Sequence, residues 1–113
     1  GDGFLATFDG PSRAVRCALA ITERLAALGI ECRCGVHTGE VEHCDGDLLG
    51  IAVHTAFRVA DEADVGEVVV TATTRDLVAG SGLEFADRGE RSLKGIGEPR
   101  RLYAVSTGRP APV

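Results

Sequence analysis

Three side chains that could bind an anionic ligand lie close together in one stretch of the sequence. Asp47 precedes Gly50, and His54 and Arg58 follow it. His54 and Arg58 are four residues apart, so they project from one face of the helix that this stretch predicts. A guanidinium can clamp a phosphate, an imidazole can donate to a ligand oxygen, and a carboxylate can accept from an amino group. The stretch therefore delivers an acid, an imidazole and a guanidinium near one place.

Each of these residues also has a purely structural interpretation. Asp47 could be a solvated turn residue, and His54 could be a half-exposed helix histidine. Arg58 could form only a surface pair with Asp61, three residues further on. Such a pair contributes only a few tenths of a kcal/mol. The sequence leaves both interpretations open at this point.

Two more charged residues stand next to glycines. Asp2 lies between two glycines, where it could present a carboxylate to a hard cation such as Mg²⁺ or Mn²⁺. Lys94 precedes Gly95 in a loop that could fold over phosphates, although the loop fits no Walker pattern. The plain alternatives are a turn aspartate and a mobile loop with one lysine.

The elements that must position these residues follow from periodicity and turn signals. Apolar residues at helical spacing predict helices over residues 11–28, 51–63 and 73–79. Alternating or continuous apolar runs predict strands over residues 4–8, 30–37, 67–71, 83–87 and 101–105. Asp45-Gly46 is a strong hairpin signal. We expect an α+β fold: a ferredoxin-like sandwich whose mixed, mostly antiparallel sheet carries its helices on one face.

Composition limits the possible functions. The chain has 113 residues, a formal net charge of −5 and a pI of about 5.1, which indicates one acidic domain and argues against general binding of nucleic acid. No apolar run is long enough to span a bilayer, and no signal peptide opens the chain, so we expect a cytoplasmic protein without a membrane segment. One region is locally basic and hints at an anionic ligand; its arginines are Arg88, Arg91, Arg100 and Arg101.

The cysteines indicate a reduced compartment. There are four of them: Cys17, Cys32, Cys34 and Cys44. Cys32 and Cys34 are two residues apart in a predicted strand, so they point the same way and are typical of small apolar filler. A zinc site made of Cys34, His37, His43 and Cys44 is the sharper alternative, but the chain lacks a CxxC pair.

Taken together, these segments resemble the catalytic domain of class III adenylyl and guanylyl cyclases, of the actinobacterial type, over residues 1–105. Residues 106–113 are expected to form a tail. Gly1-Asp2-Gly3 resembles the second metal-aspartate motif, and residues 35–39 resemble the central hairpin. Asp47 resembles the aspartate that helps to select adenine. Arg58 and Lys94 resemble the residues that contact phosphate.

The resemblance implies an adenylate cyclase that converts ATP to 3′,5′-cyclic AMP and pyrophosphate. It implies two Mg²⁺ or Mn²⁺ ions and a head-to-tail homodimer. The metal ligand Asp2 would come from one subunit. The partner would supply the substrate-binding Asp47 and Lys94 and the catalytic Arg58 and His54.

Three departures from the family pattern accompany the resemblance. The family's first strand, with its first metal aspartate, is missing, so we expect residues 1–113 alone to be inactive. The base-selecting lysine would precede Gly1. The family usually has asparagine where His54 stands, which favours an alternative: a silent cyclase homology domain for dimerisation or regulation. A binding module for RNA or a small ligand is a third possibility, disfavoured by the acidic charge and by having only four Phe and one Tyr.

Overall fold

The computed structural model describes residues 3 and 5–107, without the side chains of His43 and Leu48. Three helices lie in this part of the chain: α1 (Pro11–Ala27), α2 (Ile51–Asp61) and α3 (Ala72–Leu77). The strands are β1 (Cys34–Val36), β2 (Glu42–Cys44), β3 (Asp47–Leu49), β4 (Val68–Thr71), β5 (Glu84–Arg91) and β6 (Arg100–Ser106). None of the helices in the described residues combines the length and apolar character needed to cross a membrane.

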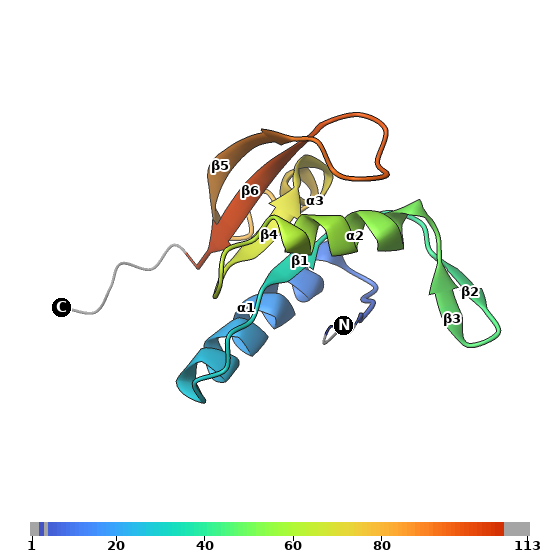
Figure 1. The fold of residues 1–113 in the computed structure, drawn as a ribbon. Helices are drawn as coiled ribbons and strands as arrows, with labels where there is room; N and C mark the ends of the chain where they lie inside the picture. The colour runs from blue at the N-terminus through green and yellow to red at the C-terminus, as the bar shows by residue number, and fades with distance from the viewer. Residues whose placement is uncertain (1–2, 4, 108–113) are drawn as a thin grey trace.

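Four of the strands form one mixed sheet in the order β1-β4-β6-β5 (Figure 1). β1 runs parallel to β4, while the β4–β6 and β5–β6 pairs are antiparallel. A bulge between Asp87 and Gly89 interrupts the long β5–β6 ladder. The predicted α+β fold with a mixed, mostly antiparallel sheet is confirmed.

The helices cover both faces of the sheet, which differs in detail from the expected placement on one face. On β4, Val68 and Val70 pack with Val15 of α1, whereas Val69 packs with Val59 of α2. Successive side chains of a strand point to opposite faces, so α1 and α2 lie on opposite sides of β4. All four residues of β4 are buried as a result.

The β2–β3 hairpin forms a separate two-stranded sheet that projects from the N-terminal end of α2 (Figure 1). Its turn is Asp45-Gly46, with φ angles of 49° and 83°. Two successive left-handed residues are typical of the tight turn that this dipeptide predicts. The hairpin signal in the sequence is thus confirmed.

Three of the predicted strands differ most from the structure. Residues 5–8 have no regular structure, so the strand expected over residues 4–8 is absent there; Phe4 lies outside the described residues. β1 covers only three residues of the predicted 30–37 strand. β5 continues to Arg91, beyond the predicted end of the strand at residue 87, so Arg88 and Arg91 belong to a strand.

Candidate functional site

Helix α2, which carries His54 and Arg58, lies directly against strand β1. A Cβ added to Gly35 would stand 2.3 Å from the backbone nitrogen of Ala60 and 2.8 Å from the carbonyl oxygen of Ala56. A helix backbone can come this close only to a residue without a side chain. Gly35 therefore sets the distance between α2 and the sheet.

The start of α2 is fixed by two further close contacts. A Cβ on Gly39 would lie 2.8 Å from the Cβ of Ala52, so the turn after β1 rests on the first turn of the helix. Gly50 precedes the helix with a φ of 131° and lies against the carbonyl oxygen of Glu40. These contacts fix the direction in which α2 leaves the hairpin.

His54 fills the space beside Gly95. A Cβ on Gly95 would lie 2.6 Å from Nε2 of His54, and Gly95 has a φ of 81°. The position therefore excludes a side chain both by its backbone conformation and by the presence of the imidazole. His54 and Gly95 thus meet although they lie far apart in the chain.

The loop that carries Lys94 is anchored on both sides. Leu93 and Ile96 are buried against Val59 of α2, and the Ile96 amide donates to the Leu93 carbonyl over 3.0 Å. Lys94 itself is exposed. The fold thus holds the loop of Lys94 beside His54, with the Lys94 side chain outside the core.

Arg58 lies one helical turn beyond His54 and is partly buried. Its Nη1 lies 3.5 Å from a carboxylate oxygen of Asp61, which is the surface pair that the sequence left open. Its Nε is buried and has no hydrogen-bond partner among the described residues. The guanidinium is therefore only partly satisfied by the protein, and donors remain for another acceptor.

Asp47 is not brought to the other three residues. It is exposed and pairs with Cys44 beside the turn of the projecting hairpin. Within the described part of the chain it makes no hydrogen bond or ion pair with His54, Arg58 or Lys94. Asp2, the predicted metal ligand, lies outside the described residues.

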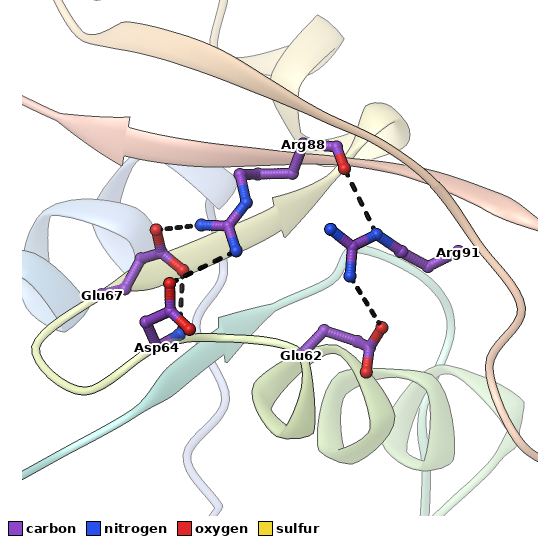
Figure 2. Close-up of polar contacts among 5 residues, drawn as sticks. All are labelled: Glu62, Asp64, Glu67, Arg88 and Arg91. Atoms are coloured by element: carbon purple, nitrogen blue, oxygen red, sulfur yellow. Dashed lines mark hydrogen bonds and ion pairs between the residues drawn. The ribbon is translucent and has the colours of Figure 1, made fainter.

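Carboxylates neutralise most of the arginines that suggested a basic region. Figure 2 shows Arg88 paired with Glu67 and Asp64, and Arg91 paired with Glu62 at an N–O distance of 3.5 Å. These pairs join β5 to the chain that follows α2.

Arg101 is neutralised in the same way, by Asp87 of the adjacent strand. It donates to both carboxylate oxygens of Asp87, over 2.8 and 2.7 Å. The pKa of Asp87 is lowered mainly by a hydrogen bond from the Gly89 amide and also by this pairing with Arg101. The local basic charge is therefore largely structural, and the hint of an anionic ligand drawn from composition is weaker than expected.

A polar network that the sequence did not single out lies where β1 and β4 end. Nδ1 of His37 lies 2.7 Å from the hydroxyl of Thr71. The hydroxyls of Thr38 and Thr74 are 3.0 Å apart, and Thr71 and Thr74 are 3.4 Å apart. Burial, assisted by the charge of Arg100, lowers the pKa of His37. The signal for this network was the run of Thr residues after two neighbouring parallel strands.

The described residues include no group of three or more His, Cys, Asp or Glu that could hold a metal ion. Cys34 and His37, two members of the zinc alternative, have separate partners: Cys34 contacts Thr22, and His37 contacts Thr71. The geometry therefore gives the zinc alternative no support. The Mg²⁺ or Mn²⁺ site stays a prediction that depends on Asp2.

Known proteins match most of the chain. The profile of the family described as "Adenylate and Guanylate cyclase catalytic domain" matches residues 14–107. An uncharacterized protein of Mycobacterium tuberculosis is 37% identical over 102 residues, which cover 88% of this chain and 35% of that protein. A protein of Rhizobium meliloti named "Putative adenylate cyclase 3" is 32% identical over 115 residues, covering 94% of this chain and 20% of that protein.

A solved structure gives the same match at the level of the fold. The crystal structure of an adenylate/guanylate cyclase/hydrolase from Silicibacter pomeroyi superposes with a TM-score of 0.82 at 30% identity. The superposition covers 93% of this chain and 68% of the other. By contrast, the chain spans only about a third of the length of the mycobacterial relative.

Proposed function

Because the chain belongs to the adenylate and guanylate cyclase catalytic domain family, we propose that it converts ATP to 3′,5′-cyclic AMP and pyrophosphate. The contact between His54 and Gly95 is the observation that supports this best. It brings the loop that carries Lys94 next to the helix that carries Arg58, and in this proposal both cations act on the same ligand. Two cations suit a ligand with several phosphates.

In the proposed reaction the ribose 3′-oxygen of ATP attacks the α-phosphorus. The bond from that phosphorus to the bridging oxygen breaks, pyrophosphate leaves, and the proton of the 3′-hydroxyl passes to solvent water. Arg58 would donate to phosphate oxygens as negative charge develops on them, and Lys94 would neutralise the leaving pyrophosphate. His54 would hold the ribose or the transition state by a hydrogen bond from its imidazole.

Asp47 would accept a hydrogen bond from the adenine amino group, which is the basis for choosing ATP over GTP. The adenine and the triphosphate are opposite ends of ATP, so Asp47 need not touch Arg58 or Lys94. The name of the Rhizobium meliloti relative favours the same substrate.

A head-to-tail homodimer would complete the site. Leu49 and Ile51, on either side of Gly50, are 49% and 63% exposed, which supports a contact with a second copy near the hairpin. In this proposal, Asp2 of one copy faces Arg58 and Lys94 of the other. Mg²⁺ or Mn²⁺ held with the help of Asp2 would make the 3′-hydroxyl more acidic and neutralise phosphate charge.

The second candidate is a silent homology domain that acts in dimerisation or regulation. Its support is His54, which stands where the family usually has asparagine. An imidazole is bulkier than a carboxamide, and here it is packed against Gly95. Its remaining freedom to reach a ribose is therefore smaller.

The two candidates differ in turnover. Cyclic AMP would be measured with ATP and Mn²⁺, using the whole protein and residues 1–113 alone. The proposal expects product from the whole protein and none from residues 1–113. A whole protein that dimerises but forms no cyclic AMP would support the silent domain instead.

A further inference from the structure

Two thiols lie side by side on the face of the sheet that packs against α1, away from the candidate site. Sγ of Cys32 is 3.6 Å from Sγ of Cys34, and Sγ of Cys34 is 3.3 Å from the hydroxyl of Thr22. All four cysteines of the chain are free, and Cys44 is exposed on the β2–β3 hairpin. Cys32 and Cys34 are the only cysteines whose sulfurs approach each other within 4 Å among the described residues.

The two cysteines are both half-buried, but they differ in what surrounds them. Cys32 lines an open hollow of about 250 Å³ between the C-terminal end of α1 and Val65, and also a second hollow beside Gly3. Cys34 packs instead against the core cluster of Val15, and burial raises the pKa of its thiol. A small reagent would therefore meet Cys32 first, with Cys34 behind it.

From this geometry we propose that Cys32 and Cys34 are a modification site that takes a low-molecular-weight disulfide and ends as an intramolecular disulfide. The Cys32 thiolate attacks the reagent RSSR, forms a mixed disulfide and releases one thiol RSH. Cys34 then attacks the sulfur of Cys32, closes the Cys32–Cys34 bond and releases the second RSH. Two protein thiols are oxidised and one reagent disulfide is reduced to two thiols, so atoms and electrons balance.

Thr22 can assist the closing step, which the raised pKa of Cys34 opposes. Thr22 donates its hydroxyl hydrogen to the Ala18 carbonyl over 2.8 Å, and rotation of the hydroxyl would let it donate to a Cys34 thiolate instead. Cys32 precedes β1, and its carbonyl oxygen accepts a hydrogen bond from the Gly66 amide over 2.7 Å, so closure has to come mainly from rotation of the two side chains. In an extended chain the two Cα atoms are about 6.6 Å apart, near the upper limit for a disulfide. The bond is therefore expected to be easily reduced.

The sequence allows a direct test, because Arg33 lies between the two cysteines. Trypsin separates residues 17–24, 25–33 and 34–58, so Cys17, Cys32 and Cys34 fall in different peptides. The folded protein is incubated with oxidised glutathione, and its free thiols are then alkylated. The masses of its tryptic peptides are measured by mass spectrometry. We expect a link between peptides 25–33 and 34–58 that reduction removes, and a loss of at least two of the four thiols per chain, since the exposed Cys44 can also react.

Matched variants assign the link. Cys44→Ser removes the other cysteine of peptide 34–58 and is expected to keep the link. Cys34→Ser is expected to leave one glutathione on Cys32. The proposal is overturned if Cys44→Ser abolishes the link, if Cys17 supplies one partner, or if the wild-type protein carries glutathione adducts alone. It is equally overturned if all four thiols of the folded protein stay unreacted while the urea-unfolded chain reacts.

Discussion

The imidazole of His54 occupies the space that a side chain on Gly95 would need, with Nε2 only 2.6 Å from the position of the absent Cβ. This contact connects α2 with the loop of Lys94. Neither residue can be enlarged without moving the other. The pairing therefore couples the position of one proposed phosphate-binding group to the helix that carries the other.

Gly95→Ala tests this coupling. The substitution adds a Cβ beside His54 at a φ of 81°, so we expect the free energy of unfolding to fall by about 2 kcal/mol. Urea unfolding measures the change. Gly66→Ala is the matched control, since Gly66 has a φ of 80° and a Cβ there meets nothing within 4 Å. Gly97→Ala, where a Cβ also meets nothing and the φ is ordinary, reports the effect of an added methyl group alone. Equal losses in Gly95→Ala and Gly66→Ala would show that the His54 contact is unimportant.

Gly35→Ala tests the packing of α2 on β1. The added Cβ would meet backbone atoms of Ala60 and Ala56, which cannot rotate away as a flexible side chain can. We expect a loss of about 3 kcal/mol in the free energy of unfolding, and the same Gly97→Ala variant serves as the control. A stability within about 0.5 kcal/mol of the wild type would contradict the close approach of helix and strand.

Arg58→Ala separates the phosphate role from the surface pair. In the whole protein we expect at least a tenfold loss in turnover, about 1.4 kcal/mol of transition-state stabilisation, with little change in folding. Asp61→Ala removes the same pair but keeps the guanidinium, so it should leave turnover within about twofold. Similar losses in both variants would assign Arg58 to the pair rather than to phosphate.

His37 should make stability depend on pH. Burial and the charge of Arg100 lower the pKa of His37 in the folded protein, whereas the pKa of His37 in the unfolded chain is about 6.5. As the pH falls below about 6.5 the unfolded chain takes up a proton first, so stability should decrease until the lower folded pKa is reached. The free energy of unfolding, measured at about pH 7.5 and at about pH 5.5, gives this decrease, and His37→Gln should reduce the decrease. An unchanged pH dependence in the variant would exclude His37 as its source.

Short stretches of the sequence were sufficient to predict the hairpin, the two longer helices and the buried strand. Asp45-Gly46 defined the hairpin, and the spacing of apolar residues defined α1 and α2. The continuous run in β4 already favoured burial on both faces. This run was the signal for helices on both sides of the sheet, and the prediction of helices on one face overlooked it.

Long-range contacts could not be predicted in the same way. Nothing near Gly95 in the sequence indicates that His54 fills its side-chain space, because 40 residues separate them. Nor does the sequence near Arg88 reveal that Glu67 and Asp64 neutralise it. Residues 5–8 had the composition of a strand, but a strand also needs a partner to pair with.

In the proposed dimer two copies share each site, and complementation between two inactive variants tests this sharing. Asp2→Ala and Arg58→Ala versions of the whole protein are each assayed alone for cyclic AMP formation. They are then combined in equal amounts, allowed to exchange subunits, and assayed again. Half of the dimers then contain one copy of each variant, and each of these dimers keeps one of its two sites intact. We therefore expect about a quarter of the wild-type activity. A mixture as inactive as its two components, beside an active wild type, would contradict the shared site.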